Sequence, residues 1–320
     1  MKTFTLFALS LFLSLNVLAQ KNITEKEIKN HITYLTADKL QGRFPGTQES
    51  SQVVKYIVKQ FKRAGIKAID HNYLQEFTAK IRVKKGVTDI PSVKTCNVVG
   101  LLEGTDPILK NEYIVLGAHY DHLGLNGASS KKPDTVGIHH GADDNASGTA
   151  ALLALAEKLA ADKTKLKRSV IFIAFGAEEQ GLLGSKYFVE HPLVPLTQIK
   201  LMMNMDMVGR MNAEKHLYMG GAASFTGGME LMKGLGPVAN INPIVIAYDV
   251  GGSDHVSFFK KNIPVLGFHT GGHPQYHTPE DTVDLINFHG EKLICDYLYQ
   301  AMLNVANRAE PIVFVAEKKN

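Results

Sequence analysis

Residues 113–119 read YIVLGAH, and the stretches VIFIAF at 170–175 and LMMNMD at 201–206 are similarly apolar. Each run has the length of a strand, and an almost unbroken apolar run is typical of a sheet covered on both faces. Helical patterns separate the runs, as between the parallel strands of a sheet. We therefore predict an α/β fold, a three-layer α/β/α sandwich around a mostly parallel, mixed central sheet.

Further segments extend this pattern. A capping box that begins at Thr24 predicts a helix to about Leu35, and an apolar stripe predicts a second helix from about Glu49 to Arg63. Later helices are expected at 147–161, 182–190, 227–234, 255–261 and 284–307. Strands are expected at 96–103, 112–119, 169–176, 200–207, 215–219, 242–247 and 264–269, with edge strands and turns over 69–95.

The length of the chain suits one large domain or two small ones. The chain has 320 residues, of which 45% are hydrophobic, and we expect residues 20–320 to form a single domain. The net charge of +4 gives no support for a nucleic-acid partner. Cys96 and Cys295 lie in apolar settings, where two unpaired buried thiols are at least as well supported as a disulfide.

The first 19 residues have the pattern of a signal peptide. Lys2 gives a positive start, residues 4–15 are apolar, and small residues end the segment at Ala19. A membrane anchor is the alternative, but the apolar run is shorter than the roughly 20 residues that span a bilayer. We predict cleavage before Gln20, export to the periplasm or outside, and no stable membrane anchor. The intact mass of the exported protein checks this.

Five polar stretches could bring oxygen and imidazole ligands together. They are GAHYD at 117–121, GADDNASG at 141–148, GAEE at 176–179, NMD at 204–206 and YHTP at 276–279. Several follow strand-like runs, and sites in such sheets form at the edge where the strands end. The sequence therefore predicts a site that holds two divalent metals and activates a water between them.

His119 and Asp121 follow the first apolar run. The imidazole should project from the strand end, and Asp121 can reach its other ring nitrogen and orient it. A lone histidine at a strand end is more often a satisfied polar residue than a ligand. His119 is therefore a candidate ligand because of its companions.

Two pairs of adjacent acids support the metal site. Capping explains one acid at Asp143 and Asp144 but not both, because neighbouring carboxylates repel each other unless a cation lies between them. The residues alone do not say which of the two bridges the metals. At Glu178 and Glu179, one side chain can bind metal while the other acts as a general base. A solvated acidic pair is the alternative.

Asp206, Tyr276 and His277 complete the candidates. Asp206 lies in a very apolar strand and needs a counter-charge, which a metal or the competing Arg210 would supply. His277 is a candidate ligand, and the Tyr276 hydroxyl could donate to an oxyanion, although both also fit an ordinary loop. Histidines without a ligand-like context are those at positions 31, 71, 122, 139, 140, 191, 216 and 289.

These motifs, together with LQGR at 40–43, Pro45-Gly46 and SDH at 253–255, resemble those of a known family. Over roughly residues 25–310 the chain resembles the secreted zinc aminopeptidases of the M28 clan. The resemblance implies an α/β/α sandwich with two zinc ions. It also implies that Asp143 bridges the zinc ions, with a cis peptide between it and Asp144. The other implied ligands are His119 and Asp206 for one zinc, and Glu179 and His277 for the other.

The implied activity is removal of N-terminal residues from peptides through a metal-bridged hydroxide, with Glu178 as general base. Asp121 would be the partner of His119, and Tyr276 matches a position that stabilises the oxyanion in some relatives only. Carboxypeptidases or dipeptidases with a basic residue such as Arg210, single-zinc glutaminyl cyclases and non-catalytic binding proteins on this fold remain alternatives. The preferred side chain, the native metal and the oligomeric state stay open.

Overall fold

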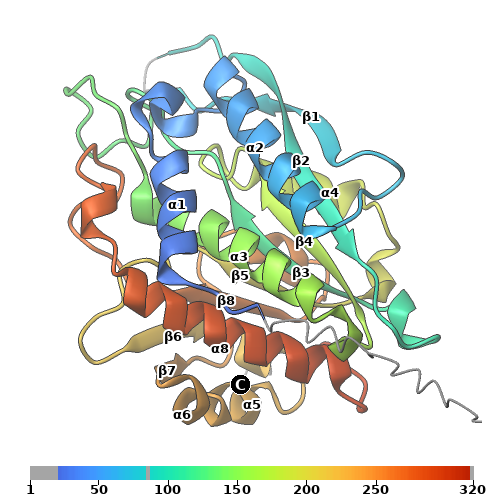
Figure 1. Ribbon diagram of the computed structural model, residues 1–320. Coiled ribbons are helices and arrows are strands. Elements are labelled where there is room, and N and C mark those ends of the chain that lie inside the picture. Colours follow the sequence, from blue (N-terminus) through green and yellow to red (C-terminus); the bar gives the residue numbers. More distant parts are fainter. Residues whose placement is uncertain (1–20, 84–86, 318–320) are drawn as a thin grey trace, which may run out of the picture.

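The centre of the molecule is an eight-stranded mixed sheet with the strand order β1-β2-β4-β3-β5-β8-β6-β7 (Figure 1). The computed structural model describes residues 21–83 and 87–317, and the predicted signal peptide at 1–19 lies outside them. The strands are β1 Leu74–Lys80, β2 Ser92–Leu102, β3 Tyr113–His119, β4 Ser169–Phe175, β5 Ile199–Met205, β6 His216–Gly220, β7 Asn242–Val245 and β8 Val265–His269.

Helices cover both faces of the sheet. They are α1 Glu25–Leu35, α2 Gln48–Ala64, α3 Gly148–Ala161, α4 Leu183–Glu190, α5 Gly228–Gly234, α6 Gly236–Ala239, α7 His255–Phe259 and α8 Phe288–Asn307. Helices α1, α2, α3 and α8 form the layer in front of the sheet in Figure 1. Helices α4 and α7 pack on the other face, where Phe188 and Phe258 join the core. The predicted three-layer α/β/α fold is confirmed.

The parallel centre of the sheet brings the candidate residues to one edge. Strands β4, β3, β5 and β8 run parallel, while β1, β2 and β6 add antiparallel pairs. The register places His119 opposite Phe175 at the ends of β3 and β4. Glu178 and Glu179 follow shortly after β4, and Asp206 follows β5 directly. All four polar side chains therefore start from the carboxyl edge, as predicted.

Two expected boundaries are wrong by four residues, and the first is the start of β2, which lies at Ser92 rather than at residue 96. The helix expected at 284–307 begins at Phe288, because Val283–Leu285 form a separate 3-10 turn. The side chain of Asn287 then caps the helix by accepting a hydrogen bond from the Gly290 amide.

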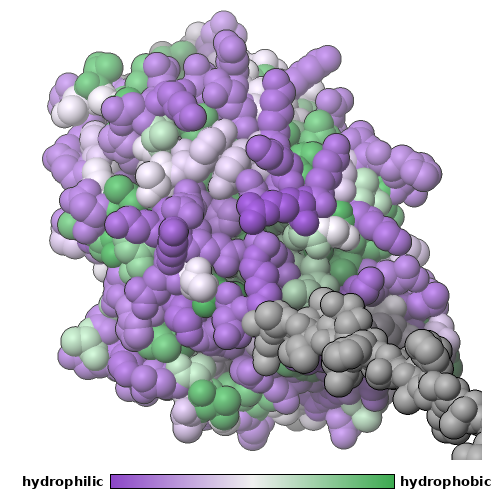
Figure 2. Space-filling model, in the orientation of Figure 1, coloured by the Kyte–Doolittle hydropathy of each residue, from purple (hydrophilic) through white to green (hydrophobic). Residues whose placement is uncertain are grey.

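The surface seen in Figure 2 is mainly hydrophilic, with apolar residues scattered among the polar ones. Within residues 21–83 and 87–317, no helix is both long enough and apolar enough to cross a membrane. Cys96 and Cys295 are buried and unpaired, so the thiols are free rather than bridged.

Arg43 is a fully buried cation that connects the N-terminal segment to two of the candidate stretches. Its guanidinium donates to the carbonyl oxygens of Tyr120 at 2.9 Å and Gly141 at 3.0 Å. It also donates to the carbonyl oxygens of His140 at 2.7 Å and Leu35 at 2.8 Å. Since Tyr120 and Gly141 belong to different stretches, one side chain fixes their spacing.

Replacing Arg43 by Met removes the donors for these four carbonyl oxygens. We expect Arg43→Met to lower the free energy of unfolding by about 3–5 kcal/mol, because buried acceptors lose their partners. Urea unfolding measures this change. Arg63→Met, at an exposed position of α2, is the matched control and should change stability by less than about 0.5 kcal/mol. Equally small effects in both variants would contradict the bracing role of Arg43.

Candidate metal centre

Two clusters of imidazole and carboxylate groups meet at the carboxyl edge of the sheet. In the first cluster, His119 Nε2 lies 3.3 Å from Asp144 Oδ1 and 3.4 Å from Asp206 Oδ1. In the second, His277 Nε2 lies 3.1 Å from Asp144 Oδ2 and 3.2 Å from Glu179 Oε2. The Asp144 carboxylate therefore faces one cluster with each of its oxygens.

Asp143 does not occupy the shared position that the resemblance implied for it. Its Oδ1 accepts a hydrogen bond from the Gly209 amide at 2.7 Å, and its Oδ2 lies 3.1 Å from His273 Nε2. The cis peptide lies between Asp144 and Asn145, so its expected place one residue earlier is wrong. Adjacent side chains of this turn point in different directions, and the one that faces the clusters is that of Asp144. Asp144 thus replaces Asp143 as the candidate bridging ligand.

Asp281 and Gly141 shape the turn that presents Asp144. Asp281 Oδ2 accepts from the backbone amides of Asp143 at 2.9 Å and Asp144 at 3.0 Å. At Gly141, φ is +54°, and a Cβ atom would lie 2.1 Å from the Asp144 carbonyl oxygen. Any other residue at this position would therefore displace the turn. Sequence analysis missed Asp281, because nothing near it indicates a partner so distant in the chain.

Two imidazoles approach Glu179, and their hydrogen bonds distinguish them. His277 Nδ1 donates to the Ser129 carbonyl oxygen at 3.0 Å, which leaves Nε2 to face the carboxylates. His122 Nδ1 lies 2.9 Å from Glu179 Oε1 and 3.9 Å from Asp144 Oδ2. We therefore assign His277 as the candidate ligand and His122 as the donor that orients Glu179. Sequence analysis set His122 aside, although it forms a potential metal group with Asp144 and Glu179.

Asp121 lies beside His119, but its carboxylate binds the backbone of Glu178 and Glu179. Its two carboxylate oxygens accept from the backbone amides of Glu178 at 2.9 Å and Glu179 at 3.3 Å. His119 Nδ1 is 3.8 Å from Asp121 Oδ1 but 3.2 Å from the Asp121 carbonyl oxygen. The predicted hydrogen bond to the ring is therefore made by the backbone of Asp121, and the carboxylate positions Glu178 and Glu179.

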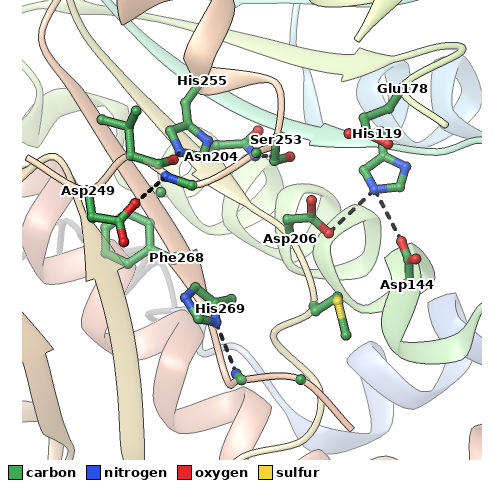
Figure 3. Close-up of a pocket in the computed structure, with 18 of the residues that line it drawn as sticks. His119, Asp144, Glu178, Asn204, Asp206, Asp249, Ser253, His255, Phe268 and His269 are labelled. Atoms are coloured by element: carbon green, nitrogen blue, oxygen red, sulfur yellow. Dashed lines mark hydrogen bonds and ion pairs between the residues drawn. The ribbon is translucent and has the colours of Figure 1, made fainter. Parts of the chain in front are cut away.

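Glu178 lines a cavity of about 320 Å³ beside the first cluster (Figure 3). The same cavity is lined by His119, Asp144 and Asp206. Burial raises the pKa of the Glu178 carboxyl well above its ordinary value, although His119 acts in the opposite direction. Glu178 is thus a proton-binding group next to the candidate ligands.

Tyr276 also lines this cavity. Its ring stacks on that of His277 with the ring centroids 3.8 Å apart, and Lys131 Nζ lies 4.3 Å from the Tyr276 ring centroid. The Lys131 amide donates to the His277 carbonyl oxygen at 3.0 Å. The loop that carries Lys131 therefore holds both aromatic rings in place.

The donor set fits divalent metals. Asp144 and Glu179 are buried, and ionised carboxylates buried together need compensating positive charge. Burial disfavours the charged form of His277, yet its hydrogen bonds to these carboxylates raise its pKa to about 10. Metal ions would supply the same positive charge, and imidazole nitrogen with carboxylate oxygen is a zinc ligand set.

Arg210, the competing partner for Asp206, is directed elsewhere. Its Nη2 donates to Gln275 Oε1 at 2.8 Å, and within the described residues no ion pair joins it to Asp206. His255 and His269 line the cavity without belonging to either cluster. The counter-charge that Asp206 needs is thus left to His119 and to a metal.

Because Asp144 faces both clusters, its substitution should reduce the metal content of the protein. We expect Asp144→Asn to retain less than about half of the zinc that the wild type retains after dialysis, because both clusters lose their common carboxylate. Inductively coupled plasma mass spectrometry gives the metal content.

Asp143→Asn is the matched control. It keeps a side-chain oxygen that can accept from Gly209, and we expect it to retain the metal content of the wild type. Equal metal loss in both variants, or loss in Asp143→Asn alone, would contradict the assignment of Asp144.

The chain is similar in sequence to known peptidases. Residues 97–302 match the family described as peptidase family M28. Aminopeptidase YwaD of Bacillus subtilis is 30% identical over 202 residues, which cover 60% of this chain and 40% of that protein. The chain therefore spans less than half the length of that relative.

Solved structures share the fold at lower identity. A Zn-dependent exopeptidase from Parabacteroides distasonis gives a TM-score of 0.72 at 19% identity, covering 91% of this chain and 100% of that chain. Porphyromonas gingivalis glutaminyl cyclase gives a TM-score of 0.68 at 19% identity, and the match covers 88% of this chain and 98% of that chain. Because both activities occur on this fold, these structures support the fold alone. On the match over residues 97–302, which includes every candidate ligand, the chain belongs to peptidase family M28.

Proposed function

We propose that the protein is a zinc aminopeptidase that removes residues one at a time from free N-termini of peptides. Membership of a peptidase family supports peptide-bond hydrolysis, and the similarity to an aminopeptidase supports action at the N-terminus. The observation that carries the proposal is the pair of clusters that share Asp144, with Glu178 in the adjoining cavity. We further propose that residues 20–320 form one catalytic domain, exported by the leader at 1–19.

Two zinc ions are proposed, which share Asp144. His119 and Asp206 would complete one ligand set, and Glu179 and His277 the other. When bound, the metals would polarise the scissile carbonyl group and lower the pKa of a water molecule.

Glu178 is proposed to transfer the proton. Hydrolysis needs an acceptor for a proton of the attacking water and later a donor to the leaving amine. Glu178 lines the cavity, while its neighbour Glu179 faces the second cluster. The bond from its amide to Asp121 fixes the backbone at this point. Its raised pKa suits a carboxyl that must hold a proton between the two steps.

Tyr276 is proposed to donate from its hydroxyl to the oxyanion that develops on the scissile carbonyl. Its ring is held between His277 and Lys131, so the hydroxyl has a fixed direction beside the cavity. Burial raises the pKa of the hydroxyl above its ordinary value, which keeps it protonated.

The rival activities are less well supported. A carboxypeptidase needs a cation for the terminal carboxylate of its substrate, but Arg210 does not line the cavity, and no Lys or Arg is found among its described lining residues. A single-zinc glutaminyl cyclase has no need of a second cluster. A non-catalytic binding protein has no need of Glu178 beside the ligands.

Peptide digestion separates these activities. The mature protein is incubated with zinc and peptides that have free N-termini, blocked N-termini or an N-terminal Gln, and the products are identified by mass spectrometry. Stepwise loss from free N-termini alone supports the proposal. C-terminal trimming would indicate a carboxypeptidase, loss of ammonia from the Gln peptide a cyclase, and no change would contradict peptidase activity.

Glu178→Gln tests the role of the general base. The amide cannot accept the proton, so we expect kcat to fall by about 10²–10⁴-fold while zinc content and unfolding stay as in the wild type. Glu190→Gln, at the exposed end of α4, removes the same charge without touching the cavity and should keep full activity. A kcat for Glu178→Gln within a few-fold of the control would rule out this role.

A further inference from the structure

The cavity continues beyond the two candidate ligand clusters, and the residues that line its far part differ from those at the clusters. Figure 3 shows Asp249 and His119 on opposite sides of the lining residues. The far part combines apolar side chains with one carboxylate, and its lining includes Ile246, Val250, Phe268 and Asp249. A peptide cleaved at the clusters would place the side chain of its first residue here. The inference therefore rests on the proposed function.

Asp249 is the charged group of this far part. The other carboxylates in the lining belong to the metal end, and the described lining residues include no Lys or Arg. Burial lowers the pKa of His255 to about 4 and also lowers that of His269, so both rings are neutral at pH 7. Bound metals would balance the negative charge of their ligands, but the negative charge of Asp249 would remain unbalanced.

The loop that carries Asp249 is tied to its surroundings. His255 Nε2 is hydrogen-bonded to the Val250 carbonyl oxygen, so the start of α7 holds the loop against the cavity. The Gly251 amide donates to Asp249 Oδ1 at 3.0 Å. This bond fixes the direction of the carboxylate, which Figure 3 shows among the lining residues.

We propose that this part of the cavity selects peptides whose first residue is Lys or Arg. The methylene groups of such a side chain would pack on Phe268, Ile246 and Val250, while its terminal cation would bind Asp249. An acidic first residue would meet repulsion from the same carboxylate. Asp249 would then be a residue that determines specificity.

Aminomethylcoumarin amides of lysine, norleucine and glutamate test the proposal, because lysine and norleucine share a stem and differ by the ammonium group. For the wild type we expect kcat/KM to be about three-fold higher for lysine than for norleucine, since Asp249 is exposed and an ion pair with an exposed carboxylate contributes only modestly. Glutamate should be the poorest substrate.

Asp249→Asn keeps the oxygen that accepts from Gly251 but removes the charge. We expect this variant to bring the ratio of lysine to norleucine close to one, with the norleucine rate changed by less than about two-fold. Asp89→Asn, an exposed position outside the cavity lining, should keep the wild-type ratio.

The outcomes separate this inference from the proposed function. A wild-type ratio near one, or a ratio that Asp249→Asn leaves unchanged, overturns the role of Asp249 while the aminopeptidase activity stands. If none of the three amides is hydrolysed, the proposed function fails, and the inference fails with it.

Discussion

The two oxygens of the Asp144 carboxylate face two different imidazoles, and the arrangement of the site depends on this. Oδ1 lies 3.3 Å from His119 Nε2, and Oδ2 lies 3.1 Å from His277 Nε2. A carboxylate that is buried and shared in this way is unfavourable without positive charge on both sides. Two metal ions would supply such charge, and in the proposed reaction they would also act as Lewis acids on the bond that is cleaved.

Groups outside the clusters keep Asp144 in this position. Asp281 binds the backbone of the turn, and Arg43 joins that turn to the stretch that follows β3. Asp121 binds the amides of Glu178 and Glu179. These side chains act on backbone groups, so they fix where the ligands start rather than contact a metal. Buried polar networks of this kind limit the motion of a site that needs precise geometry.

Much of the fold could be predicted because its signals are local. The apolar runs that became β3, β4 and β5 predicted buried parallel strands, and the ends of such strands converge at one edge. His119, Glu179 and Asp206 could therefore be placed close together from the sequence alone.

The rest of the site could not be predicted, because it depends on side-chain direction and on distant contacts. The order of Asp143 and Asp144 in the chain does not say which of them faces the clusters, since the turn is not helical. His122 shows its role only through Glu179, which lies far along the chain. Asp281 has its partners in the backbone amides of Asp143 and Asp144, which lie far back along the chain.

Anomalous diffraction from zinc-loaded crystals, recorded at the zinc absorption edge, tests the central claim most directly. The account predicts two peaks, each about 2.0–2.2 Å from a different oxygen of Asp144. A single peak, or two peaks that flank Asp143 instead, would contradict it.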